Sequence, residues 1–273
     1  MPRHKRAGTL VHRWAALAGG LILVGLLFEY WPEATEPLGS RTAVSPPVIS
    51  PPTAGGLTTG GLARSASPAA GPPPVAISYP VAGPRRYDVV PGRSAVIGRS
   101  GDLYQFRVAV EQGITGVDRA GFARFVTETY ADPRGWAAAG ERRFQRVPAG
   151  EPADFVVYLV TPGTRDALCG DAYDRYTSCR SGERVVVNVA RWAHGVPGYG
   201  ASLETYRQYV VNHETGHRFG YGHELCPGSE RPAPVMQQQT LGRHGCVANA
   251  WPEVNGREYH GASGQYHDPV PPP

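Results

Sequence analysis

Three histidines and one glutamate form the strongest chemical pattern in the sequence: His213, Glu214, His217 and His223. His213 and His217 are four residues apart, so on a helix their imidazoles lie on one face, one turn apart. Two such nitrogens can bind a single metal ion at about 2.0–2.1 Å. Glu214 projects from the same turn, too far round to reach that ion. Its carboxylate is therefore expected to hold a metal-bound water.

Gly220 explains how a third ligand can reach the same ion. It follows His217 by three residues, and a glycine can adopt the left-handed conformation that ends a helix without a Cβ penalty. A turn at this point brings His223 back toward the first two histidines. Three protein ligands with one open position are typical of a catalytic zinc, whereas structural zinc sites have four. The alternative is a solvated surface helix whose histidines have unrelated contacts.

Hydrophobic periodicity predicts the helices and strands that position this site. A helix is expected to begin at Leu203 and to continue into the motif, with Tyr206 and Val210 on the same inward side as the histidines. Another helix is expected between Asp118 and Asp132-Pro133, since proline disfavours helical geometry in the residue before it. Alternating or β-branched runs predict four strands, at Leu103–Val110, Arg142–Val147, Asp154–Val160 and Arg184–Val189.

Charge in this 273-residue chain is concentrated at the N-terminus. Basic residues number 27 and acidic residues 23, and four basic residues lie among the first thirteen: Arg3, Lys5, Arg6 and Arg13. The remainder is formally neutral and has no electrostatic footprint for nucleic acid. Lys5 is the only lysine, which excludes a lysine-dependent phosphate loop or Schiff-base site in the rest of the chain.

Residues 1–31 are predicted to form a basic tail and a membrane anchor. The run Ala15–Phe28 has no charge, and aromatic residues flank it, as they do at membrane interfaces. This predicts a single-pass protein with its C-terminal domain outside the cytoplasm. The run is also short enough for a signal peptide, in which case the domain would be secreted after cleavage.

Differences in composition divide the chain after residue 31 into three regions. Residues 32–84 are rich in Pro, Gly, Ser, Thr and Ala and are expected to be a disordered linker, because they cannot bury enough apolar surface to offset chain entropy. Residues 85–268 are expected to fold as one domain, and residues 269–273 to form a proline-rich tail. Little regular structure is expected after the zinc motif.

All four cysteines lie in the second half of the chain. An even number in an exported domain favours two disulfides, and sequence proximity suggests the pairs Cys169–Cys179, around a polar loop, and Cys226–Cys246. Four cysteines allow three connectivities. Buried free thiols or a second metal site are the alternatives.

The zinc motif resembles the signature of the metzincins, a group of zinc endopeptidases. The likeness includes the glycine at position 216 inside the helix and a methionine, Met236, thirteen residues after His223. The resemblance implies that Met236 forms the methionine turn beneath the metal. It also implies an α+β, zincin-like fold: a twisted mixed sheet, an active-site helix and a small irregular C-terminal subdomain. By the same analogy, Arg184–Val189 would lie at the substrate cleft and pair with an extended peptide.

A second likeness runs from Val211 to Trp251. Two segments there, Val235-Met-Gln-Gln-Gln-Thr-Leu-Gly and Gly245-Cys-Val-Ala-Asn-Ala-Trp, are similar to an uncharacterised family of membrane-anchored envelope proteins of high-GC Gram-positive bacteria. This likeness covers most of residues 85–262 and implies no particular substrate.

These patterns favour an extracytoplasmic zinc endopeptidase in which Glu214 is the general base and the three histidines hold the metal. Its partner would be a protein or peptide of the cell envelope. The alternatives are an inactive zinc-binding envelope module and a zinc amidase or peptidase that acts on cell-wall peptides. Four other histidines are not assigned to catalysis: His194 and His244 are expected at the surface, and His260 and His267 near a disordered end.

Overall fold

The computed structural model of the chain describes residues 76–170 and 173–272. The predicted basic tail and anchor at residues 1–31, and nearly all of the predicted linker, lie outside these residues. Within the described residues, no helix is both long and apolar enough to cross a membrane.

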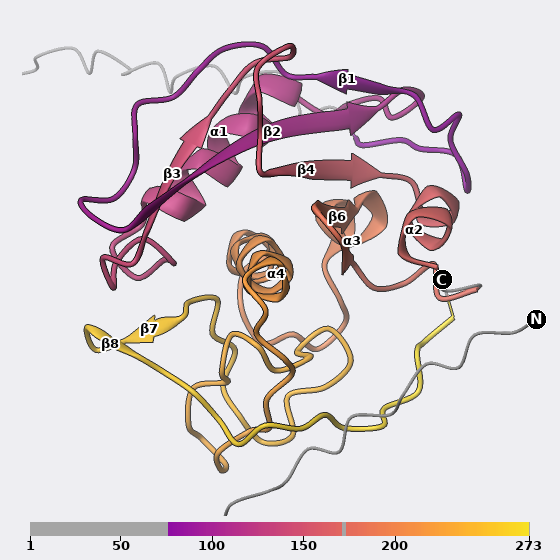
Figure 1. The fold of residues 1–273 in the computed structure, drawn as a ribbon. Coiled ribbons are helices and arrows are strands. Elements are labelled where there is room, and N and C mark those ends of the chain that lie inside the picture. The colour runs from indigo at the N-terminus through magenta and orange to yellow at the C-terminus, as the bar shows by residue number, and fades with distance from the viewer. Residues whose placement is uncertain (1–75, 171–172, 273) are drawn as a thin grey trace, which may run out of the picture. The chain divides into compact units, whose positions relative to one another are not determined.

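The first part of the domain is built on a twisted mixed sheet (Figure 1). Its strands in the described residues are β1 (Tyr87–Val89), β2 (Asp102–Glu111), β3 (Arg142–Arg146), β4 (Phe155–Val160), β5 (Cys179–Ser181) and β6 (Arg184–Asn188). The main path runs β1-β2-β4-β6-β5, and β3 also pairs with β2. The pairs β2–β3, β2–β4 and β4–β6 are parallel, whereas β1 and β5 are antiparallel to their neighbours. The fold is therefore α+β with a mixed sheet, as predicted.

Four helices accompany the sheet in the described residues: α1 (Arg119–Ala131), α2 (Pro162–Cys169), α3 (Val189–His194) and α4 (Leu203–Arg218). Helix α4 lies between the sheet and the C-terminal part of the chain (Figure 1). It contacts β6 and α1, and its buried residues belong to the same apolar core as the strand residues of the sheet. Burial on both sides explains why α4 shows little of the polar face that surface helices carry.

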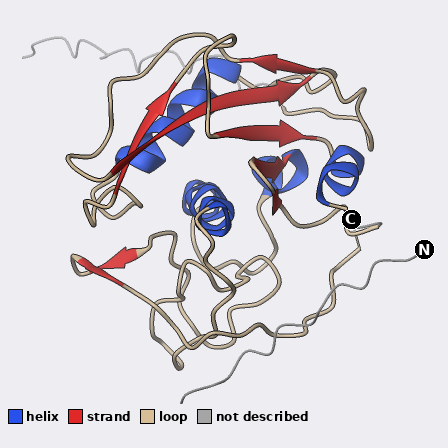
Figure 2. Cartoon of the chain, viewed as in Figure 1, coloured by secondary structure: helices blue, strands red, loops and turns tan. Residues whose placement is uncertain are grey.

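The C-terminal part, residues 219–272, is mostly irregular (Figure 2). Its regular structure is limited to one short antiparallel pair among the described residues, β7 (Glu253–Val254) and β8 (Arg257–Glu258). A disulfide between Cys226 and Cys246 crosses it, and a second disulfide joins Cys169 to Cys179 at the edge of the sheet. Both predicted pairings are confirmed, and the described residues contain no free cysteine.

The four predicted strands and both predicted helices are present, with ends that differ by one or two residues. Helices α2 and α3 were not predicted, because each is too short to show a helical period. The expectation that Arg184–Val189 would pair with an extended peptide was wrong, because β6 already pairs with β4 on one side and with β5 on the other. The outer strand on that side of the sheet is therefore β5.

The folded region also begins earlier than residue 85. Ser78 pairs with Thr115, the amide of Gly163 donates to the carbonyl of Val81 at 2.8 Å, and Ile77 and Tyr79 pack against the core. Residues 77–83, assigned to the linker from composition, thus belong to the domain. Composition missed them because this short segment is stabilised by contacts with distant residues rather than by its own pattern.

Candidate metal centre

Residues next to α4 fix both of its ends. The Ser202 hydroxyl accepts a hydrogen bond from the Thr205 amide at 3.1 Å, which caps the N-terminus. At the other end Gly220 has φ 91°, in the left-handed region, as predicted. The Tyr221 amide donates back to the carbonyl of Gly216 at 3.1 Å. The chain therefore reverses directly after the helix and carries His223 back toward it.

The three predicted ligands converge on one point. The Nε2 atom of His217 lies 3.2 Å from Nε2 of His213 and 3.1 Å from Nε2 of His223. One nitrogen from each ring lies within 4.8 Å of the other two. Tetrahedral ligands with bonds of about 2.0–2.1 Å are separated by about 3.3 Å, so these distances fit a zinc ion.

The contacts of the second nitrogen of each ring indicate which nitrogen is free to bind a cation. Each Nδ1 lies within 2.9 Å of an oxygen that only accepts hydrogen bonds: Val235 O for His213, Tyr221 O for His217 and Gln265 Oε1 for His223. Each Nδ1 must therefore carry the proton, which leaves a lone pair on each Nε2. Three lone pairs within 4.8 Å of one another repel unless a positive ion lies between them. The donor set thus fits a metal that prefers imidazole, such as zinc.

Burial keeps two of these rings neutral. It lowers the pKa of His213 well below its usual value, and the neighbouring His217 and His223 lower it further. Burial likewise lowers the pKa of His217 to about 4. Only neutral imidazole can bind a metal through Nε2 while Nδ1–H donates, so both rings are in the binding form at neutral pH.

Glu214 is buried in the wall of the same cavity, with 6 % of its surface exposed. Burial raises the pKa of its carboxyl to about 8, although the positive charges of Arg165 and Arg180 act in the opposite direction. Among the described residues, no hydrogen-bond or ion-pair partner contacts this carboxylate. A metal dication beside it would lower its pKa again. Its oxygens therefore remain available to a water molecule in the cavity.

The turn at residues 234–237 supports the site from below. Val235 supplies the carbonyl that holds His213, and the side chain of Met236 is fully buried against α4. A Cβ at Gly216 would lie 2.3 Å from the Met236 sulfur and 2.8 Å from Trp136. The glycine in the helix therefore permits close packing of Met236 against α4.

A cavity of about 350 Å³ opens in front of the histidines. One side is formed by α4, at Tyr209 and Glu214, and by the segment after the methionine turn, at Gln238 and Leu241. Residues of α2, the loop before β5 and β5 itself also line the cavity: Arg165, Asp174, Thr177, Ser178, Cys179 and Arg180. The cavity is thus lined by α4, by the edge of the sheet and by the irregular part.

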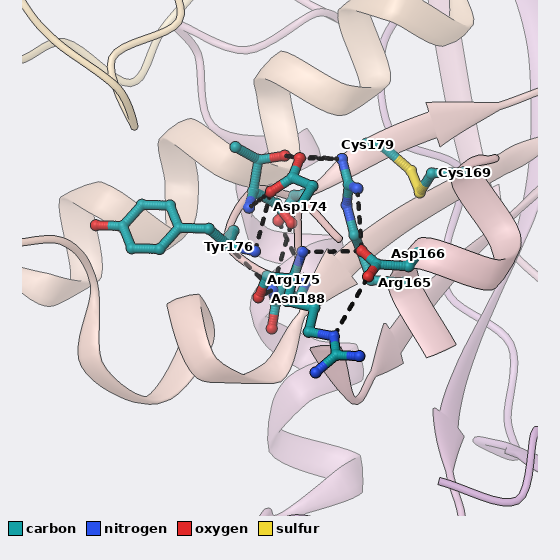
Figure 3. Close-up of polar contacts among 10 residues, drawn as sticks. Arg165, Asp166, Cys169, Asp174, Arg175, Tyr176, Cys179 and Asn188 are labelled. Carbon is teal, nitrogen blue, oxygen red and sulfur yellow. Dashed lines mark hydrogen bonds and ion pairs between the residues drawn. A yellow bond between two sulfur atoms is a disulfide. The ribbon is translucent and has the colours of Figure 1, made fainter. Parts of the chain in front are cut away.

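The loop that leads into β5 is held by a buried polar network (Figure 3). The Arg165 guanidinium, 3 % exposed, pairs with Asp174 at 2.6 Å and with Asp166 at 3.3 Å, and it donates to Thr177 at 2.8 Å. The Asn188 side chain donates to the carbonyl of Arg175 at 2.8 Å. Together with the nearby Cys169–Cys179 disulfide, these contacts fix the outer strand beside the cavity.

Other histidines lie away from the three-histidine cluster. His194 is exposed at the end of α3, and His267 is exposed in the C-terminal tail. His244 pairs with Asp268 at 2.7 Å. The expectation of disorder near His260 was wrong, since its Nδ1 lies 2.9 Å from Glu224 Oε1.

The sequence analysis missed several residues around the cavity, chiefly Arg165, Arg180, Gln238 and Gln265. Single arginines and glutamines carry no spacing signal, so sequence alone offered no way to find them.

A family model described as Protein of unknown function (DUF3152) matches residues 73–253. The chain belongs to this family. No curated protein and no solved structure matches the chain. The DUF3152 match includes α4, the three histidines and the methionine turn, but it ends before Gln265. The segment that contacts His223 therefore lies outside the matched region.

Proposed function

We propose that this DUF3152 protein is a zinc-dependent endopeptidase with a zincin-like catalytic domain of the metzincin type. The observation that carries the proposal is the pairing of three converging Nε2 lone pairs with a buried, partnerless carboxylate in one cavity. A site that only binds metal has no need of Glu214, whose burial in charged form is unfavourable.

The three histidines and Glu214 would have different roles, metal binding and proton transfer. His213, His217 and His223 would hold a zinc ion, which would supply a lowered pKa for water and a positive charge to polarise the scissile carbonyl. Glu214 accepts the proton of the attacking water on a carboxylate oxygen and passes it to the nitrogen of the leaving amine. Met236 packs beneath the ligands without binding the metal.

The substrate would be an extended peptide. Strand β5 is the outer strand beside the cavity, and an extended chain can add to such an edge through main-chain hydrogen bonds. Arg180, on β5, lines the same cavity and contributes positive charge close to Glu214 and His217. That charge would stabilise the negative oxygen that develops as the carbonyl is attacked.

Two disulfides support an oxidising compartment and thus a location outside the cytoplasm. We infer that the substrate is a protein or peptide of the cell envelope. Anchoring by residues 1–31 remains a prediction from the sequence.

The decisive test compares the full wild-type chain with Glu214→Gln, both produced under oxidising conditions and loaded with zinc. A mixed peptide library would be incubated with each, and new termini read by mass spectrometry. We expect cleavage by the wild type that a chelator abolishes, and a loss of at least about 1,000-fold in the variant, which keeps its zinc.

Glu204→Gln is the matched control, because Glu204 is exposed in the first turn of the same helix. It should cleave as the wild type does. Loss of zinc from Glu214→Gln would contradict the assigned roles. Cleavage of cell-wall peptide fragments alone would favour an amidase, and no cleavage by the folded, zinc-loaded chain would favour a binding module.

A further inference from the structure

The C-terminal segment is integrated into the metal centre before it reaches the cavity. The Leu225 amide donates to Ala262 O at 2.8 Å, and the Gly264 amide donates to His223 O at 3.0 Å. The next residue, Gln265, accepts from Nδ1 of His223. The segment therefore leaves the third ligand in a fixed direction.

Beyond Gln265 the segment is held by one side chain, His244. The rings of Tyr266 and His244 are stacked with their centroids 3.4 Å apart, and Nε2 of His244 lies 2.7 Å from Asp268 Oδ2. His244 is close in sequence to Leu241, which lines the cavity. These two contacts hold residues 266–268 against the loop that follows Leu241.

The end of the segment reaches the cavity itself. Val270 lines it together with the three histidines, Glu214 and residues of β5. Val270 lines the same cavity as Arg165 of α2, whereas the segment begins in the irregular part, where Ala262 O accepts from the Leu225 amide. The segment therefore runs from the irregular part to the cavity.

Prolines flank Val270 at positions 269, 271 and 272. Proline has no amide hydrogen and a fixed φ, so only Val270 in residues 269–272 can donate a main-chain hydrogen bond to β5. The stiffness of the stretch also lowers the entropy lost when it is held in place. Val270, which is 44 % exposed, therefore lies at the cavity on a stiff, proline-flanked segment.

We propose that residues 266–272 form an inhibitory strap that covers the cavity and must leave it before a peptide can bind. The proposal rests on the peptidase function proposed above. His244 is the latch: its contacts with Tyr266 and Asp268 set the fraction of molecules in which the cavity is open. That fraction scales the apparent affinity for any peptide.

The test compares four proteins: the full wild-type chain, a chain shortened to end at Gln265, and the full-chain variants His244→Asn and His267→Asn. Asparagine suits position 244 because its φ of 50° lies in the left-handed region, which asparagine tolerates. His267 is exposed in the strap and has no side-chain partner among the described residues, so its variant is the matched control. Amide hydrogen exchange of residues 176–181 and 237–242 reports coverage of the cavity without requiring zinc or activity.

We expect exchange in both segments to be about tenfold faster in the shortened chain and in His244→Asn, with kcat/KM for a peptide raised by a similar factor. The control should match the wild type. A synthetic peptide of residues 266–273 should restore protection in the shortened chain and inhibit it.

Equal exchange in all four chains would overturn the strap, whatever their activity. Faster exchange with unchanged hydrolysis by an active enzyme would overturn its inhibitory role. Faster exchange in chains that cleave no peptide would leave the strap in place and count against the peptidase function instead.

Discussion

The sheet-bearing part of the domain, residues 76–218, and the irregular part, residues 219–272, meet at α4 but are held together differently. The first has a ladder of parallel strands and a core of stacked aromatic rings. The second relies on single side chains: Asn249, for example, donates to the carbonyls of Ala233 and Trp251 at 2.9 Å. Many interchangeable contacts stabilise the first part, whereas a few specific bonds define the second.

The candidate metal centre takes its histidines from both parts. His213 and His217 come from a helix buried by the sheet, and His223 comes from the irregular part. The difference indicates that two ligands are positioned by the fold as a whole, and the third by local bonds that single substitutions can remove. Four predictions test this contrast, from the largest expected effect to the smallest.

The largest effect is expected at Glu214 in the zinc-free chain, where its carboxyl is buried. Its pKa is raised from 4.5 to about 8, so its stabilising contribution is present below pH 4.5 and is lost as the pH rises through about 8. Gln cannot ionise. We expect Glu214→Gln to be more stable than the wild type by about 4 kcal/mol at pH 8 and equally stable at pH 4.

Urea unfolding with a chelator present measures both values. The lowered pKa values of His213 and His217 make both proteins less stable as the pH falls from about 6.5 through about 4, and this shared loss cancels in the comparison. Glu204→Gln should show no difference of this kind at either pH. If the difference in unfolding free energy between the wild type and Glu214→Gln were the same at pH 4 and pH 8, the Glu214 carboxyl would be solvated in the folded chain.

The two disulfides offer a direct comparison of the parts. They close loops of similar size, with sequence separations of 10 and 20, so replacing either pair with serine should cost about 3 kcal/mol of unfolding free energy. Only the loss of Cys226–Cys246 should also weaken zinc binding, by at least about tenfold, because that bridge lies between His223 and the segment after Met236. Equal losses of zinc affinity, measured by competition with a chromophoric chelator, would contradict the contrast.

Gly216→Ala probes the contact between the parts. Alanine favours a helix by about 1 kcal/mol over glycine, so helix propensity alone predicts stabilisation. The new methyl group would instead overlap Met236 and Trp136, and we expect a net loss of about 2 kcal/mol in chemical denaturation. Gly121→Ala, in α1, meets only the flexible Asp118 carboxylate and should be neutral or stabilising.

The smallest effect is expected at Gln265. It is the one side chain among the three groups that accept from the ligand Nδ1 atoms, since the other two acceptors are backbone carbonyls. Gln265→Ala should lower zinc affinity about tenfold with little change in stability. Unchanged affinity in a zinc-competition titration would show that the loop alone orients His223.

The same contrast explains what the sequence could reveal. The strands, α1 and α4 were predictable because the sheet part is organised by periodicity, and the three ligands because their spacing is set by one helix and one glycine. Short elements such as α2 and β5 carry too few residues for a period. The positions of Gln265 and Val270 could not be recognised, because they depend on contacts between residues distant in sequence. Gln265 contacts His223, more than forty positions away, and Val270 lines the cavity together with residues of α4 and β5.

The contact between His223 and Gln265 also has a consequence for synthesis. A ribosome makes the helical ligands first, and 42 residues separate His223 from the side chain that orients it. A nascent chain therefore holds two ligands long before the third is set. The candidate metal centre gains all three of its Nδ1 contacts only after residue 265 has emerged, so a chain that stops before it is expected to bind zinc more weakly.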